Sequence, residues 1–383
     1  MNMVAPIAAQ SLAPLRAEWR PLATWPAIMP AWRALARRAL EPNIFYEPGF
    51  ALPAAAAAFG RDVGAVLVWS PADQLTGFFP ARIERRLGMP VLSAWTHPYA
   101  PLGTPLVDRD EADAVLTAWL EHLASDSALP GLVLLPLLPE DGPFADALAR
   151  ALTRRDVAHA AFGQHRRAAL VPAGRADYIE HAIGAKKRKE LRRQRHRLAD
   201  AGSVTIDTTR DAAAIGDALR DFLALEARGW KGRAGTAAAK HDEIRHFIDD
   251  AMSALAADGQ VRIDRLRMSG QTIAAAITLR SGAHAWTWKI AYDEAHARFS
   301  PGVQLMLDVT EALLADDAVA HADSCATADH PMIDHLWRER LALSDRLIAV
   351  RAKPTTFALA CRLEHLHRRI IAAAKSVRDW MRR

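Results

Sequence analysis

The segment RFSPGVQ at 298–304 has residue types that suit a phosphate-binding turn ahead of a helix. Ser300 is a preferred N-cap residue, and Pro301 suits the first helical position. Gly302 lets a ligand approach the backbone closely. The free N–H groups and the positive dipole end of such a helix attract a phosphate, and Arg298 could add a bidentate contact. A helix that is merely capped fits the same residues, so both interpretations stay open.

A second segment, EARGWKGRAGT at 226–236, is punctuated by glycines, and its part from Gly229 onward carries two cations and an indole. Trp230, Lys231 and Arg233 together suit an anionic, partly planar ligand. Glu226 lies one helical turn before Trp230 and is a candidate general base. The alternatives are an ordinary loop that ends a helix and a solvated helix glutamate.

The third segment, WTWKIAY at 286–292, reads as a strand. Alternation predicts two faces, one with Trp286, Trp288, Ile290 and Tyr292 and the other with Thr287, Lys289 and Ala291. A lysine in a central strand is costly unless it is paired, so Lys289 indicates a cleft or an anionic partner. An edge position that faces water is the alternative.

A proline-rich loop at 96–106, which carries His97 and Tyr99, either lines a cleft between domains or is a rigid structural loop. The short motifs of nucleotide-binding loops, serine hydrolases and zinc proteases are absent from the sequence. The 15 histidines lack metal-ligand spacing, and two cysteines cannot build a disulfide framework. We therefore expect no metal and a reducing compartment.

Hydrophobic periodicity and turn residues predict the elements that position these segments. In the first half they predict helices at 25–40, 111–124 and 144–154, strands at 64–69, 75–83 and 131–138, and a loop at 88–107. In the second half the predicted order is helix 176–201, strand 204–208, helices 211–229 and 241–257, strands 261–268, 272–279 and 284–292, helix 302–315, strand 320–326, a short helix from 330 and strand 343–350. Alternating helices and strands predict an α/β fold.

Five segments in this order resemble the FemAB-related branch of the GNAT superfamily, specifically the CelD-like (cellulose biosynthesis, BioF-type acetyltransferase) proteins. They are EPNIFYEPGFALPA at 41–54, HPYAPLGTPLVD at 97–108, AKKRKELRRQRHRLADAG at 185–202, LEARGWKGRAGTA at 225–237 and WKIAYDEAHARFSPGVQL at 288–305. The resemblance implies two tandem GNAT-like domains with central mixed sheets flanked by helices. It also implies acyl or aminoacyl transfer to an amine or hydroxyl, acyl-CoA (acetyl-CoA) as co-substrate, and an acceptor related to the envelope or to exopolysaccharide.

The chain departs from the usual GNAT pyrophosphate loop, [QR]-x-x-G-x-[GA], because RFSPGV has Pro301 where an N–H donor would lie. FemAB enzymes use aminoacyl-tRNA, and the basic run at 186–197 would suit RNA as well as a linker. Two alternatives to acyl-CoA transfer therefore stay open: an aminoacyl-tRNA-dependent transferase, and a non-catalytic module that recruits an envelope polysaccharide synthase.

On this interpretation the sequence assigns roles to named residues. The donor-binding residues are Trp230, Lys231, Gly232, Arg233, Lys289, Arg298, Ser300, Gly302 and Val303. Tyr292 is the candidate acid for the leaving group, and the candidate bases are Glu226, Asp293 and Asp323.

The chain has 383 residues, 51% of them hydrophobic and 24% charged, which suits a globular protein of two domains. We expect a disordered N-terminus at 1–10, an N-terminal GNAT-like domain at 11–170, a basic helical linker at 171–203, a C-terminal GNAT acyltransferase domain at 204–352 and a basic amphipathic helix at 353–383. No signal peptide or membrane span is expected, which favours a cytoplasmic protein.

The last 33 residues, 351–383, carry a net charge of +7 in a chain whose total is +5. Their apolar residues recur at alternating spacings of four and three and form one helical seam: Leu359, Leu363, Leu366, Ile370, Ala373, Val377 and Trp380. Such a seam with basic flanks fits docking on the chain itself, a partner helix, or peripheral contact with the inner face of a membrane.

Overall fold

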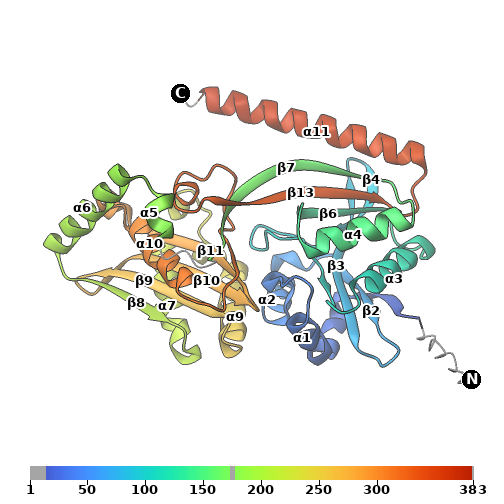
Figure 1. Ribbon diagram of the computed structural model, residues 1–383, viewed down its shortest axis with the longest axis horizontal. Helices are drawn as coiled ribbons and strands as arrows, with labels where there is room; N and C mark the ends of the chain where they lie inside the picture. The colour runs from blue at the N-terminus through green and yellow to red at the C-terminus, as the bar shows by residue number, and fades with distance from the viewer. Residues whose placement is uncertain (1–13, 173–176, 382–383) are drawn as a thin grey trace, which may run out of the picture.

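The computed structural model of the chain describes residues 14–172 and 177–381, so the disorder expected at 1–10 lies outside the described residues. Within them, thirteen strands join in one mixed sheet, and helices cover its faces (Figure 1). The sheet order is β1-β2-β3-β4-β6-β13-β7-β12-β11-β10-β9-β8, with β5 paired to β3. The predicted α/β fold class, with a helix at the C-terminal end, is confirmed.

The strands of this sheet are β1 Arg16–Pro21, β2 Val63–Trp69, β3 Leu75–Arg86, β4 Met89–Ala94, β5 Leu106–Val107, β6 Leu132–Pro139, β7 His159–Leu170, β8 Val204–Thr209, β9 Val261–Met268, β10 Gln271–Ser281, β11 His284–Tyr292, β12 His321–Asp323 and β13 Glu339–Ala349. The α-helices are α1 Met29–Arg37, α2 Pro48–Ala54, α3 Ala112–Ser125, α4 Pro143–Arg154, α5 Tyr178–Ala182, α6 Ala185–Ala201, α7 Ala212–Arg228, α8 Trp230–Arg233, α9 Asp242–Ala257, α10 Pro301–Leu314 and α11 Pro354–Met381. Short 3₁₀ turns include η5 Glu294–Phe299 and η6 Ile333–His335.

The last strand of the chain joins the two halves of the sheet. β13 lies between β6 and β7 and is antiparallel to both, with Leu343 opposite Pro139 on one side and His165 on the other. β7 then pairs with β12, where Asp323 lies opposite Ala169. The sheet therefore runs without interruption from one half to the other, and the domain boundaries at 203 and 352 stay predictions.

Helices from both halves share a core on one side of this sheet. α2 packs against α9, and the rings of Phe50 and Phe247 meet edge to face with centroids 5.3 Å apart. Trp286 and Trp288 of β11 reach the same core. On the opposite face, α6 and α10 contribute Leu198 and Leu305 to a separate core. β11 is thus covered on both faces, and it carries two of the candidate site residues, Lys289 and Tyr292.

Several elements differ from the sequence prediction. The predicted helix 176–201 is two helices, because Ile183 and Gly184 adopt extended backbone between α5 and α6. The predicted loop 88–107 contains β4 and β5. β7 was not predicted at all: its sequence, HAAFGQHRRAAL, lacks β-branched residues, and pairing with two neighbouring strands overrides that weak propensity.

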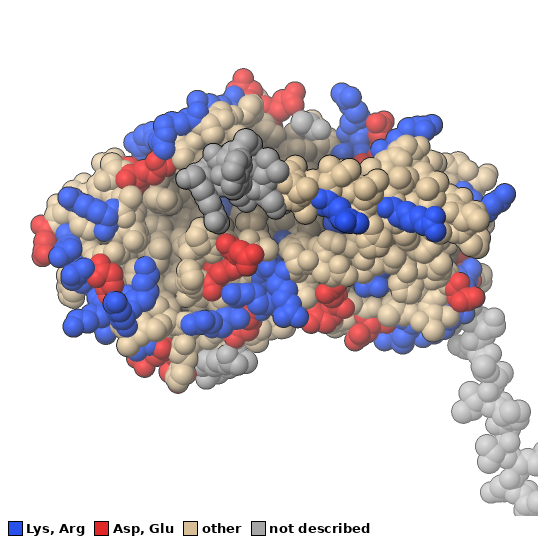
Figure 2. Space-filling view, turned by 90° about the horizontal axis from the view of Figure 1, so that it is seen from above, with Lys and Arg blue, Asp and Glu red and all other residues tan. Residues whose placement is uncertain are grey.

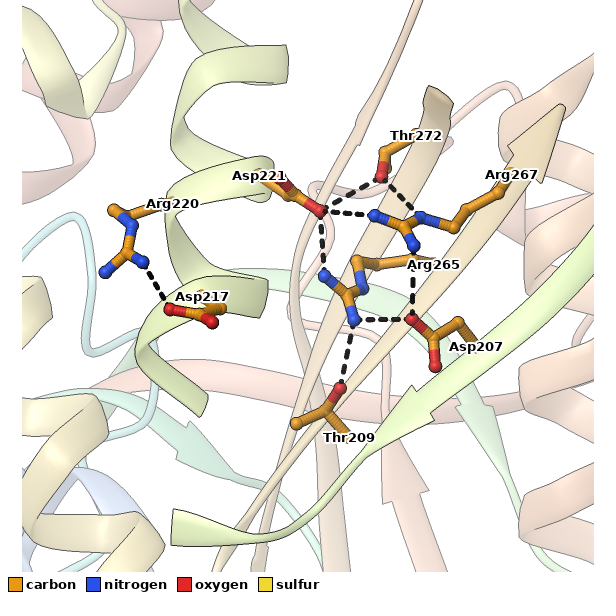
Figure 3. A network of polar contacts seen from close by, with 8 residues as sticks. All are labelled: Asp207, Thr209, Asp217, Arg220, Asp221, Arg265, Arg267 and Thr272. Carbon is orange, nitrogen blue, oxygen red and sulfur yellow. Dashed lines mark hydrogen bonds and ion pairs between the residues drawn. The ribbon is translucent and has the colours of Figure 1, made fainter. Parts of the chain in front are cut away.

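A polar network fastens α7 to the edge of the sheet (Figure 3). Asp221 of α7 accepts hydrogen bonds from Arg265 at 2.7 Å and from Thr272 at 3.1 Å. Arg265 is mostly buried and also pairs with Asp207 of β8 at 2.5 Å. Because one guanidinium joins the helix and the edge strand, this network holds in place the helix that ends beside the candidate site.

Candidate active site

A bulge in β11 creates the first feature of the candidate site. In the β10–β11 ladder Ile277 lies opposite Lys289 and Thr278 lies opposite Thr287, which leaves Trp288 as the extra residue. The predicted alternation is therefore wrong beyond this point. Trp288 packs in the core under α7 and α9, whereas Ile290 packs on the opposite face.

A divergence of β11 from β12 creates the second feature. The two strands pair in parallel from His284 to Trp286, and beyond Trp286 the described residues give β11 no strand partner on that side. The chain turns away after β12 through Cys325, which has a positive φ of 52°. The free edge of β11 at 287–290 can therefore offer backbone groups to a ligand.

Two contiguous cavities lie along this edge. One, of about 260 Å³, is lined by residues of β11, of the chain after β12 and of the 98–101 loop. The other, of about 490 Å³, lies between the end of α7, the last residues of β11 and the start of α10. Lys231, Ile290, His330 and Met332 line both. Together the cavities give space for two substrates that meet at the strand edge.

Glu226 holds two lysines at the junction of the cavities. Its Oε1 lies 3.1 Å from Nζ of Lys289 and 3.0 Å from Nζ of Lys231, and its Oε2 accepts the backbone N–H of Ala238 at 3.0 Å. The glutamate is 3% exposed, so the predicted alternative of a solvated helix glutamate is wrong. Burial would raise the pKa of Glu226, but the two lysines and the amide together hold it below its usual value.

Lys289 points to the loop from the first half of the chain. Its Nζ lies 4.8 Å from the centroid of the Tyr99 ring, and the carbonyl of Tyr99 accepts the indole N–H of Trp288 at 2.8 Å. Burial lowers the pKa of Lys289, against the opposing effect of Glu226. The loop at 96–106 therefore lines the cleft, one of the two alternatives that the sequence left open.

The start of α10 faces the larger cavity, but its geometry differs from the prediction. Ser300 is not a side-chain N-cap, because it has left-handed backbone with φ 51° and its hydroxyl makes no capping hydrogen bond. Pro301 occupies the first turn as predicted. A Cβ at Gly302 would come within 3.1 Å of the Tyr292 ring, so the glycine lets the tyrosine pack against the helix. The backbone of Ser300, Gly302 and Val303 lines the cavity at the positive end of the helix dipole.

The segment at 226–236 divides into residues that line the cavities and residues that shape the loop. Trp230 and Lys231 line a cavity, and Trp230 is 57% exposed. Arg233 pairs with Glu294, which also accepts the N–H of Trp230 at 2.7 Å. A Cβ at Gly232 would lie 1.7 Å from the carbonyl oxygen of Ala227, so this glycine is required for packing.

Three other predicted site residues lie outside the described lining of both cavities. Arg298 is exposed and stacks over Phe299 at 4.6 Å. Asp293 accepts the N–H of Ala295 at 2.9 Å and so starts η5. Asp323 is buried at the end of β12 and pairs with Arg167 of β7. Its position suggests that it holds the two halves of the sheet together.

His330 was not singled out in the sequence, yet it lines both cavities. Its Nδ1 accepts the backbone N–H groups of Met332 at 3.3 Å and Ile333 at 3.5 Å. Burial lowers the pKa of His330, which favours the neutral ring with its proton on Nε2. The imidazole can therefore donate a hydrogen bond. The sequence around His330 contains no motif that predicts a functional role, because the residue lies in a loop whose neighbouring side chains form no recognisable pattern.

Within the described residues, no group of three or more His, Cys, Asp or Glu side chains could hold a metal ion. A helix long and apolar enough to cross a membrane is likewise absent from the part of the chain that the structure describes.

Residues 185–330 match the family described as acetyltransferase (GNAT) domain. A search of curated proteins gave no match. Among solved structures, FemX superposes with a TM-score of 0.59 at 10% identity, over 86% of this chain and 98% of that one. The C-terminal domain of an Agrobacterium fabrum protein described as a lysylphosphatidylglycerol synthetase gives a TM-score of 0.55 at 11% identity, over 88% and 95%. Identities this low establish the fold alone. The chain thus shares the fold of these two structures, and residues 185–330 match a GNAT acetyltransferase domain.

Proposed function

We propose that the protein transfers an acyl group from an acyl-CoA to an amine or hydroxyl of an acceptor. The observation that carries this proposal is the free edge of β11 at 287–290, which runs from a small cavity to the N-terminus of α10. An acyl carbonyl bound at a strand edge and a phosphate group bound at a helix N-terminus would lie in line, as a phosphorylated thioester donor requires.

In this proposal the larger cavity holds the donor. Its phosphates lie against the backbone of Gly302 and Val303, with Lys231 as the cation that lines the same cavity. The indole of Trp230 offers an exposed planar surface at the rim. Arg298 and Arg233 contribute less than the sequence suggests, because neither is among the described lining residues and Arg233 is paired with Glu294.

The acceptor enters from the smaller cavity and attacks the acyl carbon. Its N–H or O–H proton passes to a base as the new C–N or C–O bond forms. The C–S bond then breaks, and the leaving thiolate takes a proton from Tyr292. Of the three candidate bases, Glu226 lines a cavity, so we assign it this role together with the positioning of Lys289. We assign stabilisation of the developing oxyanion to the Nε2–H of His330, which lines both cavities.

The sequence resemblance extends the proposal to an acceptor from envelope or exopolysaccharide synthesis. An aminoacyl-tRNA donor is the second candidate, and the exposed face of α6 favours it. Its exposed basic residues extend over several turns: Lys186, Lys187, Lys189, Arg192, Arg193 and Arg197. Such a surface suits a nucleic-acid backbone.

The donor can be identified by turnover. Purified protein with a panel of acyl-CoAs and amine or hydroxyl acceptors should release free CoA thiol, and addition of RNase should not change the rate. Gly302→Val should abolish this release, because the new side chain meets Tyr292 and fills the phosphate position. Gly216→Val is the matched control, since a Cβ at this helical glycine of α7 meets nothing within 4 Å.

RNase-sensitive transfer from charged tRNA, without CoA release, would favour the second candidate. If calorimetry detects binding of neither donor, the protein is a non-catalytic module and the proposal fails.

A further inference from the structure

Large apolar side chains face solvent along α11. Leu359, Leu366 and Ile370 are 52%, 55% and 58% exposed, and Ile371 is 41% exposed. They account for half of the large hydrophobic residues exposed in the described part of the molecule. Leu359, Leu366 and Ile370 lie on one side of the helix and form an exposed apolar row, whereas Ile371 lies on the side of Glu364. An exposed apolar row of this kind marks a surface that binds something else.

The opposite side of the same helix docks on the sheet. Phe357, Ala360 and Cys361 pack with strands β4, β6, β7 and β13, and Glu364 is buried between Arg86 and Arg368. At 3.6 residues per turn, the docked residues and the seam residues lie on opposite sides of the helix. The predicted seam is therefore not the docking face, and its exposed residues lie on the side of the helix away from the sheet. Figure 1 shows α11 running along β7 and β13.

The charges beside the seam are basic. Arg362 and Arg369 are exposed and flank the apolar row. Between Pro354 and Ala374, the part of the helix whose side chains are described, the acidic residue is Glu364, and it faces the sheet. Figure 2 looks down on this side of the molecule, where blue basic groups stand among tan surface and red acidic groups are also present. In the sequence the net charge of 351–383 is +7.

These charges disfavour a second copy of the chain as the occupant. If two copies of the helix paired in antiparallel fashion, Arg362 of one copy would lie opposite Arg369 of the other. If they paired in parallel, Arg362 of one copy would lie opposite His367 of the other. Neither arrangement supplies an acid from the described turns. An apolar row with basic flanks is instead the pattern of a helix that lies on an anionic membrane surface.

We propose that α11 is a membrane-surface helix whose exposed seam enters the interface of an anionic phospholipid bilayer. Leu359, Leu366 and Ile370 insert among the acyl chains, and Arg362 and Arg369 pair with the headgroups. The docked side of the helix transmits this attachment to the sheet, so the whole protein is held at the membrane.

Co-sedimentation of the full chain with vesicles tests this proposal. The protein should pellet with phosphatidylglycerol vesicles at low salt and stay in solution with phosphatidylcholine vesicles. The Leu366→Gln/Ile370→Gln variant should lower the partition coefficient roughly tenfold or more, because two inserted side chains are lost. The Arg362→Gln/Arg369→Gln variant should lower it about fivefold for each charge removed, and high salt should erase that difference.

Ile83→Gln is the matched control, because Ile83 of β3 is 41% exposed but lies off the helix. It should pellet like the unmodified protein, and circular dichroism should give all variants the same helix content. The proposal is overturned if the unmodified protein does not pellet with anionic vesicles, or if the seam variant pellets equally well. Sedimentation equilibrium that reveals a dimer, dissociated by the seam variant, would assign the seam to a second copy instead.

Discussion

At the scale of single residues, Glu226 combines more roles than a general base needs. One buried carboxylate holds Lys231, Lys289 and the amide of Ala238, and so joins α7, α8 and β11 at the junction of the two cavities. Removal of one partner from a buried ion pair leaves an uncompensated charge, which costs more than the pair itself contributes.

We expect Glu226→Ala to lower the free energy of unfolding by about 3–5 kcal/mol, because Lys289 would stay buried without its anion. Glu226→Gln should destabilise less at neutral pH. The folded-state pKa of Glu226 lies below its usual value of 4.5, so the stability that its charge contributes is present above pH 4.5 and is lost as the pH falls through the folded-state pKa. Urea unfolding from pH 7 to pH 3 should therefore show the gap between wild type and Glu226→Gln closing below pH 4.5. Glu243→Gln, at an exposed position of α9, should change little at any pH.

Lys231 and Arg233 make a second test at this scale. The sequence predicts similar roles for them, but Lys231 lines both cavities while Arg233 is paired with Glu294 outside their described lining. Lys231→Ala should weaken donor binding by about 1.5–3 kcal/mol, the value of a charge-assisted contact. Arg233→Ala should leave the affinity nearly unchanged by isothermal titration calorimetry. Equal losses in the two variants would contradict this assignment of the loop.

The sequence identified the chemistry of the site better than its geometry. The sequence predicted an anion or a cleft beside Lys289, because a strand lysine cannot be buried alone. The structure has both: Glu226 is the anion, and the smaller cavity is the cleft. The face of the sheet on which Ile290 packs could not be predicted, because the bulge at Trp288 depends on the register of β11 with β10. Ser300 is a frequent N-cap type, but its left-handed backbone carries the hydroxyl away from the capping position. His330 and Tyr99 reach the site only through the tertiary fold.

At the scale of elements, apolar strands and amphipathic helices were predictable, whereas polar strands were not. β2 and β10 have buried apolar runs, and both were found from sequence. β7 carries two arginines and two histidines among its twelve residues, and both its partners, β12 and β13, come from the C-terminal part of the chain. Local pattern cannot reveal a strand that is stabilised by such distant pairing.

The network that fastens α7 to the sheet edge gives a prediction for one element (Figure 3). Asp221→Ala removes the acceptor of Arg265, Arg267 and Thr272, and should lower the free energy of unfolding by about 2–3 kcal/mol. Asp217→Ala is the matched control one turn away, because Asp217 pairs with Arg220 in an ion pair whose side chains are 73% and 74% exposed. It should cost less than about 1 kcal/mol. Similar losses in the two variants by urea unfolding would show that the network does not fasten the helix.

At the scale of the whole molecule, the chain crosses between its halves more often than a tandem arrangement requires. β13 returns to the first half after the GNAT domain match ends at 330, and α11 continues over the same strands. Sequence pattern predicted the types of β13 and α11 but not this return, because both read equally well as additions to the second half.

Deletion of 354–383 tests whether this last helix is part of the fold. It would expose Phe162, Leu134 and Leu347, which α11 covers, and would leave Arg86 without Glu364. We therefore expect the truncated protein to unfold in urea with a free energy lower by about 3 kcal/mol or more, and to bind an apolar dye. In the full chain, Leu366→Gln should leave the unfolding free energy unchanged, because the side chain that it replaces already faces solvent. If truncation costs nothing while Leu366→Gln destabilises, then the apolar seam, and not the side that carries Glu364, is the face that docks on the protein.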